Sequence, residues 1–292
     1  MKIENTEVFN FEGALRGMRN PLDSWSKSDS EFGTIYDLSI YAKKEDISWD
    51  IAESYYVKEM GNKDWQQSTD YSKELNEAEK QISKYQDWLI KEGVKWNNSF
   101  ATYNFIGPND MDLAQRLIKA GPEHRKFLRQ ILVSFDLTAP FYFWKEFDTY
   151  KVATVSNSCS TMHKLASYPI DVDNFEIEDF NPDLIFWIDD NGDSPVNYEI
   201  RDHIEDHIFF LEKLRQKYLE TKDKRYWKEL VRWLPEGWLQ KRTITLNYET
   251  LRSMWIQRHN HKLTEWHTFC NWIESLPYAK NLILYDTVFM EP

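Results

Sequence analysis

The sequence predicts an α/β fold in the mixed sense, with a mostly antiparallel central sheet, helices packed around it and a helical C-terminal part. Three observations predict it. Apolar and polar residues alternate from Phe127 to Leu137, an apolar stripe of helical period runs from Glu199 to Glu220, and two further helical patterns follow near the end. With 292 residues, 41% of them apolar, the chain has ample material for a core. We expect a single domain over residues 1–292.

The first third combines short strand-like and helical patterns. Residues 1–60 mix alternating pieces such as "TIYDLSIYAK" with turn signals such as "MRNP", which predicts a few strands and a short helix. From Asp70 to Lys91 the apolar residues recur at helical spacing. This stretch is predicted to be an amphipathic helix packed on the core, and a short coiled-coil seam is the alternative.

The middle of the chain predicts helix, strand and helix in turn. "GPNDMDLAQRLIKAG" opens with Pro and an acidic first turn and closes on Gly121, as a capped helix does. "KFLRQILVSFDLTAP" reads as a mostly buried strand that ends at Ala139-Pro140, because Pro removes a ladder donor. "FYFWKEF" then predicts a helix.

The C-terminal half is predicted to be mainly helical. A helix over Glu199–Glu220 is followed by helices over Tyr248–Arg258 and Lys262–Leu276. Residues 170–195 are acidic, but "DDNGDS" lacks the ligand spacing of a calcium loop and reads as a solvated turn. His203 and His207 lie one helical turn apart and could hold zinc, yet no third ligand is identifiable, so no metal is assigned.

Composition excludes several classes of function. The net charge of −12 argues against binding bulk nucleic acid but permits a small anionic ligand in a local basic pocket. Two cysteines give no disulfide framework. The start has no signal sequence and no apolar run is long enough for a membrane span, so we expect a soluble cytoplasmic protein. The 16% aromatic content suits a packed core, ligand stacking or an oligomer interface.

Residues Thr154 to Thr161, "TVSNSCST", are nearly all small hydroxyl or amide types, with Cys159 among them. Apolar packing cannot use so many polar groups in a row. They either form a solvated loop whose hydroxyls cap helix ends, or they bind a ligand.

Three segments between residues 110 and 275 share their order and spacing with a known family. They are "LIKAGPEHRKFLRQILVSFDLTAPFYFWKEFDTYKVATVSNSCSTMH", "VRWLP" and "TLNYETLRSMWIQR". Together they resemble the flavin-dependent thymidylate synthases (ThyX), in which a strand ends in Ala-Pro and the next helix carries R-Q-W-x-R-H-R-x-x-S-x-N-E-x-S-x-R-Y. The resemblance implies a ThyX-like fold, with residues 1–100 as an N-terminal extension and about 165–225 as an acidic insertion.

The match is partial at the level of single residues. With one inserted residue, Asn157 and Ser160 match the Asn and the second Ser of the first motif. In the last segment Asn247, Leu251 and Arg258 are in register without an insertion. The R-H-R positions hold Thr149, Tyr150 and Lys151, so only one charge remains. Lys does not reproduce the bidentate fork of Arg, which weakens the expectation of flavin binding.

The resemblance implies a phosphate cradle and a cofactor site. Hydroxyls and loop amides suit phosphate oxygens. The cradle would comprise Asn157, Ser158, Ser160 and Thr161, with Arg258 and Arg232 as charged partners. The flavin positions are Thr149, Tyr150, Lys151 and Asn247. Cys159 is the catalytic candidate, because a thiolate can add to C6 of a uracil ring; the alternative is a bystander thiol.

The function that the resemblance implies is methylation of deoxyuridine monophosphate (dUMP) at C5, or a related C5 modification. Flavin adenine dinucleotide (FAD), a reduced nicotinamide cofactor and methylenetetrahydrofolate would take part, in a homotetramer with sites between subunits. The alternative is a nucleotide-binding relative without redox chemistry that sequesters or senses a nucleotide. A third interpretation is an interaction protein whose aromatic residues form interfaces.

Overall fold

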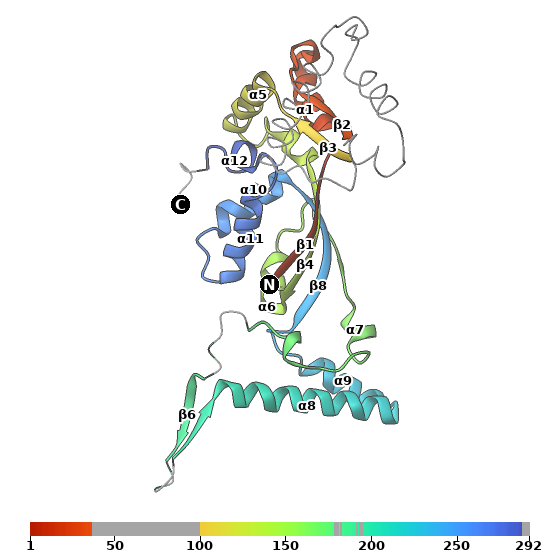
Figure 1. The fold of residues 1–292 in the computed structure, drawn as a ribbon, viewed down its shortest axis with the longest axis vertical. Coiled ribbons are helices and arrows are strands. Elements are labelled where there is room, and N and C mark those ends of the chain that lie inside the picture. Colours follow the sequence, from red (N-terminus) through yellow and green to blue (C-terminus); the bar gives the residue numbers. More distant parts are fainter. Residues whose placement is uncertain (37–99, 178–180, 182, 191, 193–194, 288–292) are drawn as a thin grey trace, which may run out of the picture. The chain divides into compact units, whose positions relative to one another are not determined.

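The computed structural model describes residues 1–36, 100–177, 181, 183–190, 192 and 195–287 (Figure 1). The chain divides into two compact units, Met1–Phe9 with Leu132–Ile273, and Asn10–Ile131 with Glu274–Pro292. The helix predicted from Asp70 to Lys91 lies outside the described residues.

The first unit is built on a four-stranded antiparallel sheet. Its strands, in spatial order, are β1 (Lys2–Phe9), β4 (Leu132–Pro140), β8 (Leu239–Asn247) and β5 (Val155–Ser158). Alternate residues of β4 from Val133 to Ala139 are fully buried, as the alternation of the sequence predicts. The strand ends at Pro140, also as predicted. These findings confirm the mostly antiparallel sheet.

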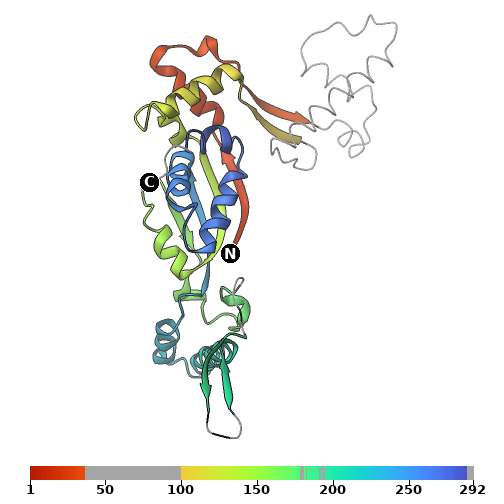
Figure 2. The same ribbon diagram turned by 90° about the vertical axis from the view of Figure 1, so that its left-hand side faces the viewer.

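Three helices pack on this sheet: α6 (Phe141–Phe147), α10 (Tyr248–Arg258) and α11 (Thr264–Glu274) (Figure 2). The first two have the predicted bounds, and α11 is shorter at both ends than the predicted Lys262–Leu276. The buried faces of α6 and α11 are joined by an aromatic cluster, which comprises Phe143, Trp144, Phe147, Trp266 and Phe269. Much of the aromatic surplus therefore serves the core.

The acidic part of the first unit forms its own small layer. After β5 come α7 (Thr161–Lys164), η5 (Val172–Asn174), the hairpin of β6 (Ile185–Asp189) and β7 (Val196–Glu199), α8 (Ile200–Thr221) and α9 (Lys224–Arg232). The helix predicted over Glu199–Glu220 is confirmed as α8. A separate core fills this layer; its buried members are Leu165, Ile170, Phe175, Leu211 and Leu230.

A partly buried ion pair on α8 holds the loop that follows α7. Glu212 accepts two hydrogen bonds of 2.7 Å from Arg215 and one of 3.0 Å from the backbone N–H of Ile170. The Arg215 hydrogen bonds lower the pKa of Glu212 to about 2 against the opposing effect of burial. Arg215 also donates to the carbonyl of Ala166, so the loop after α7 is held on α8.

The second unit contains helices and a two-stranded ladder. Its elements are α1 (Phe11–Arg19), η1 (Asn20–Leu22), η2 (Trp25–Lys27), β2 (Glu31–Tyr36), β3 (Phe100–Phe105), α5 (Pro108–Lys119), η4 (Lys126–Gln130) and α12 (Ala279–Leu282). The capped helix is confirmed as α5, and Gly121 after it has a φ of 104°, a left-handed conformation that favours Gly. The strand prediction from Phe127 is wrong at its start, because 126–130 form a 3₁₀ helix.

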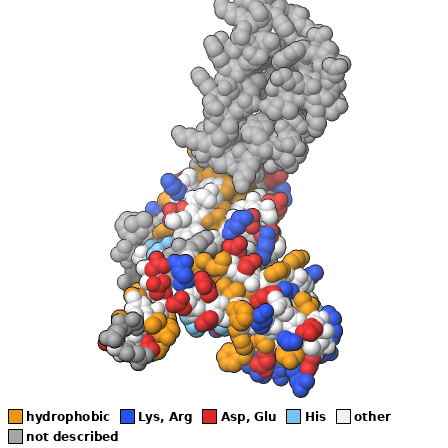
Figure 3. Space-filling model, turned by 60° about the horizontal axis from the view of Figure 1, so that its bottom comes forward, with side chains coloured by type: hydrophobic (Ala, Val, Ile, Leu, Met, Phe, Trp, Pro, Cys, Tyr) orange, Lys and Arg blue, Asp and Glu red, His pale blue; other side chains and the backbone are white. Residues whose placement is uncertain are grey.

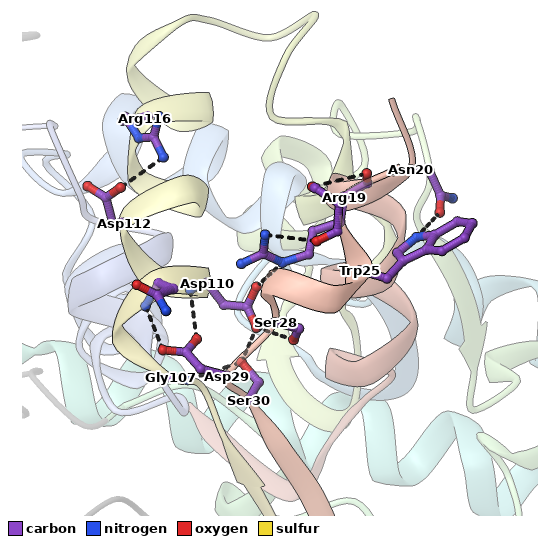
Figure 4. A network of polar contacts seen from close by, with 12 residues as sticks. Arg19, Asn20, Trp25, Ser28, Asp29, Ser30, Gly107, Asp110, Asp112 and Arg116 are labelled. Carbon is purple, nitrogen blue, oxygen red and sulfur yellow. Dashed lines mark hydrogen bonds and ion pairs between the residues drawn. The ribbon is translucent and has the colours of Figure 1, made fainter. Parts of the chain in front are cut away.

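The N-terminus of α5 is organised by a buried carboxylate (Figure 4). Asp110 is fully buried and accepts hydrogen bonds from the Arg19 guanidinium and from the hydroxyls of Ser28 and Ser30. Asp29 in turn accepts from the backbone N–H groups of Asn109 and Asp110, at 2.9 and 3.1 Å. The network closes the turn after α1 onto the start of α5.

Candidate phosphate-binding edge

The hydroxyl-rich segment forms β5, the last strand of the sheet. It pairs with β8, with Asn157 opposite Thr243 and Ser158 opposite Arg242. All four residues of β5 are exposed. The segment is thus a row of polar side chains on an open sheet edge, where backbone N–H groups on the outer side can also donate to a ligand.

Because side chains alternate along a strand, the predicted phosphate-binding residues Asn157 and Ser158 lie on opposite faces of the sheet. Directly opposed residues share one face of a sheet, so Ser158 lies beside Arg242, and Asn157 lies beside Thr243 on the other face. Arg242 donates to Asp148 at 2.7 Å and to Gln240 at 2.9 Å. Its guanidinium lies 4.1 Å from the centre of the Trp144 ring.

Arg242 was missed by the sequence reasoning. Its position opposite Ser158 follows only from the pairing register, although an Arg in an alternating strand pattern is a signal that could have drawn attention to it. Its second terminal nitrogen has no partner within the described part of the chain, so it can donate to a bound anion.

Two hydrogen bonds join the chain after β5 to β8. The N–H of Cys159 donates to the carbonyl of Lys241 at 2.8 Å, and the Cys159 carbonyl accepts from the Gln240 side chain at 3.1 Å. The thiol is exposed. Ser160 caps α7, its hydroxyl oxygen accepting from the N–H of His163 at 3.2 Å, which leaves the hydroxyl proton available. Thr161 opens α7 and is partly exposed.

Thr154, just before β5, has a buried hydroxyl oxygen without a hydrogen-bond partner among the described residues. Leaving such a group unsatisfied costs about 1–3 kcal/mol. A polar ligand or a water molecule at this edge would remove that cost.

The predicted charged partners are engaged elsewhere. Arg258 donates to Glu146 and to the Tyr150 hydroxyl, both at 2.9 Å, and its guanidinium lies 5.0 Å from the centre of the Trp266 ring. Arg232 lies on α9 and pairs with Glu229. Within the described residues, no hydrogen bond joins either arginine to β5 or α7.

Three of the four residues at the predicted flavin positions are engaged in hydrogen bonds within the chain. Asn247 is buried and caps α10, accepting from the N–H of Thr250 at 2.9 Å. Thr149 donates to the carbonyl of Glu146, and the Tyr150 hydroxyl bonds Gln257 and Arg258. Lys151 is exposed and, alone of the four, has no partner among the described residues. Among these four positions Lys151 is the one cation, and Lys does not offer a phosphate the bidentate fork of Arg.

The histidine pair on α8 is not completed to a metal site by the described residues. The rings of His203 and His207 are 6.2 Å apart, and His207 Nε2 lies 3.0 Å from the carbonyl oxygen of Trp233. Groups of three or more metal-ligating side chains were not found in the described ranges. Within the same ranges, no helix has both the length and the apolar character to cross a membrane.

Comparison with solved structures identifies the fold. A thymidylate synthase X (ThyX) from Helicobacter pylori, solved with FAD and dUMP, is similar over 99% of this chain and 100% of that chain, with a TM-score of 0.53 and 12% identity. This chain has a ThyX-like fold. The prediction drawn from the sequence resemblance is therefore confirmed at the level of the fold.

Two further structures match the ThyX-like fold over a smaller share. Another structure of H. pylori ThyX, complexed with FAD and dUMP, is similar over 62% of this chain and 83% of that chain, with a TM-score of 0.43 and 16% identity. The UMP/dUMP methylase PolB from Streptomyces cacaoi, bound with 5-Br UMP, is similar over 62% of this chain and 84% of that chain, with a TM-score of 0.43 and 14% identity. No protein-family model and no curated protein matches the sequence.

Proposed function

We propose that this chain binds a pyrimidine nucleoside monophosphate, with the phosphate at the β5–α7 edge. The observation that carries the proposal is the open strand β5, where Ser158 faces Arg242, within a ThyX-like fold. The solved neighbours are named as complexes with dUMP or 5-Br UMP. Such a protein would sequester or sense the nucleotide without redox chemistry.

The donor set suits one phosphate. Ser158 and Ser160 offer hydroxyl protons, and Arg242, directly opposite Ser158 in the sheet, offers its second terminal nitrogen. A charge-assisted hydrogen bond from Arg to phosphate is short and strong, and neighbouring hydroxyls add neutral ones. Asn157, on the opposite face, is assigned to the base or the sugar in this proposal.

Calorimetry with dUMP and UMP tests the phosphate site. We expect both nucleotides to bind, and deoxyuridine, which lacks the phosphate, to bind at least about 10-fold more weakly. Ser158→Ala is expected to weaken the binding of dUMP by about 10-fold, because each lost donor to a charged group costs about 1.5–3 kcal/mol. Arg242→Gln is expected to have the larger effect. Ser167→Ala and Arg225→Gln, which change exposed residues elsewhere, are the matched controls. Absence of heat with every pyrimidine and purine nucleotide would overturn the proposal.

Uptake of flavin, measured by absorbance, distinguishes a nucleotide-binding protein from a ThyX-type enzyme. After incubation with FAD and desalting, we expect the protein to lack visible flavin absorbance, because the flavin positions supply one available cation. Retained flavin would restore the expectation of reductive C5 methylation with methylenetetrahydrofolate and a reduced nicotinamide cofactor. Thr149, Tyr150, Lys151 and Asn247 would then have to rearrange.

A second candidate function is C5 chemistry on the bound base, favoured by the exposed thiol of Cys159 directly after β5. The thiolate adds to C6 of uracil, and the C5 carbanion takes a proton from solvent. Loss of the other C5 proton and expulsion of the thiolate regenerate the base. The net result is exchange of the C5 hydrogen with water, which requires no cofactor.

Proton NMR of dUMP in deuterated buffer tests this chemistry. We expect the C5 signal to decay with the protein, and Cys159→Ala to abolish the decay while calorimetric binding persists. Cys270→Ala, which changes the buried cysteine, should leave exchange in place. Unchanged exchange in Cys159→Ala would make this thiol a bystander.

A further inference from the structure

The chain that follows β5 carries two of the predicted phosphate donors, Ser160 and Thr161. Just before them, the N–H of Cys159 donates to the carbonyl of Lys241, which fixes the start of this stretch on β8. Residues 160–170 then comprise the cap of α7, α7 itself and the loop after it. Figure 1 shows α7 between the sheet and the layer that contains α8 and α9. The position of the two donors therefore depends on what holds residues 160–170.

In the part of the chain that the structure describes, both hydrogen bonds that join residues 160–170 to the rest of the fold go to one ion pair on α8. The N–H of Ile170 donates to Glu212 at 3.0 Å, and Arg215 donates to the carbonyl of Ala166 at 3.2 Å. Glu212 and Arg215 are themselves joined by two hydrogen bonds of 2.7 Å. We call this pair the α8 clamp. The same stretch also contributes apolar side chains to the core of this layer.

The α8 clamp is more buried than its neighbour on the same helix, the pair of Lys217 and Glu220. The side chains of Arg215 and Glu212 are 11% and 19% exposed, whereas those of Lys217 and Glu220 are 55% and 65% exposed. Basic and acidic side chains lie side by side on the outer surface of this end of the molecule (Figure 3). Such exposed pairs contribute little, because water screens them. Removing one member of the α8 clamp instead leaves its partner and the bonded backbone groups unsatisfied.

We propose that the α8 clamp sets the affinity of the β5–α7 edge for the phosphate of the nucleotide, because it fixes residues 160–170 and with them the donors of α7. The inference rests on the proposed nucleotide-binding function. Glu212 and Arg215 act through this stretch of chain and not by contact with the ligand, so they are positioning residues. The acidic insertion, about residues 165–225, thus contributes to the phosphate site through α8.

A site with fixed donors binds more tightly than one whose donors move. When the binding-competent arrangement is only a fraction of the population, the apparent dissociation constant rises by the inverse of that fraction. Without the α8 clamp, two backbone groups lose their partners and local opening of residues 160–170 becomes easier. Ser158 and Arg242 lie on the paired strands β5 and β8 and keep their positions. The expected loss therefore concerns the donors of α7 and is partial.

Calorimetry on Glu212→Gln tests the inference, because Gln has nearly the size of Glu but no charge. We expect the dissociation constant of dUMP to rise about 5- to 10-fold, and that of deoxyuridine, which lacks the phosphate, to stay within about 2-fold. Arg215→Lys keeps a cation beside Glu212 but lacks the second arm of the fork that reaches Ala166, so an intermediate effect on dUMP is expected. Glu220→Gln, in the exposed pair, is the matched control and should bind dUMP as the native chain does.

Hydrogen exchange of backbone amides, measured without nucleotide, reports on the same stretch of chain directly. We expect the amides of residues 160–170 to exchange at least about 10-fold faster in Glu212→Gln, with those of β8 unchanged. Circular dichroism checks that the variants are folded.

Three results would overturn this inference alone: native affinity for dUMP in Glu212→Gln, equal weakening of dUMP and deoxyuridine, or weaker binding of dUMP without faster exchange. A native chain that binds no nucleotide would overturn it together with the proposed function.

Discussion

Replacing Asp110 with Ala is expected to lower the free energy of unfolding by about 3–5 kcal/mol, the range for removing one partner of a buried ion pair. The loss would leave the Arg19 guanidinium, 5% exposed, without its carboxylate, and would free the hydroxyls of Ser28 and Ser30 (Figure 4). Urea denaturation of both chains at neutral pH measures this change in the free energy of unfolding.

Asp112→Ala is the matched control on the same helix. Asp112 is 67% exposed and pairs with Arg116 at 2.9 Å, so the expected change is at most about 0.5 kcal/mol. A similar effect of both substitutions would show that the Asp110 network contributes nothing special to stability.

The Asp110 contribution should also depend on pH. Burial alone would raise the pKa of this carboxyl, but hydrogen bonds from Ser28, Ser30 and Arg19 outweigh it, and the pKa is lowered below 3.8. A lowered pKa means that the stabilisation is present above about pH 4 and is lost as the pH falls through the folded-state value. The difference between native chain and Asp110→Ala should therefore shrink in acid.

Replacing Trp266 with Ala is expected to cost about 3–5 kcal/mol, the range for deleting a large buried aromatic side chain. Trp266 is fully buried, and its ring centre lies 4.6 Å from that of Phe143. Its indole N–H donates to Glu146 at 2.9 Å. Thermal and urea unfolding measure the loss.

Trp266→Phe separates packing from the hydrogen bond. Phe keeps an aromatic ring but cannot donate to Glu146, so a smaller loss of about 1.5–3 kcal/mol is expected. Trp25→Ala is the control at a half-exposed Trp and should change stability by less than about 1 kcal/mol. If Trp266→Ala were no worse than Trp25→Ala, the aromatic cluster would not be the centre of the core.

Local pattern predicted much of the fold because the signals are short in range. The alternation in β4 and its end at Pro140 follow from strand geometry and the missing N–H of Pro. The bounds of α6 and α10 were predicted from apolar spacing and flanking residues. The error at Phe127 has the same origin, since a 3₁₀ turn and a strand cannot be told apart over five residues by alternation alone.

The sequence by itself determined β4, α5, α6, α8 and α10, the hydroxyl-rich segment around Cys159 and, through ordered motifs, the ThyX-like fold, but it did not predict the strands β5, β6, β7 and β8. Only the tertiary structure decided which side chains meet. Ser158 lies opposite Arg242 because of strand register, and Asn157 lies on the other face for the same reason. Arg258 is engaged by Glu146, a contact between helices that are far apart in sequence. The sequence gives the type of each residue, whereas strand register and helix packing decide which residues are in contact.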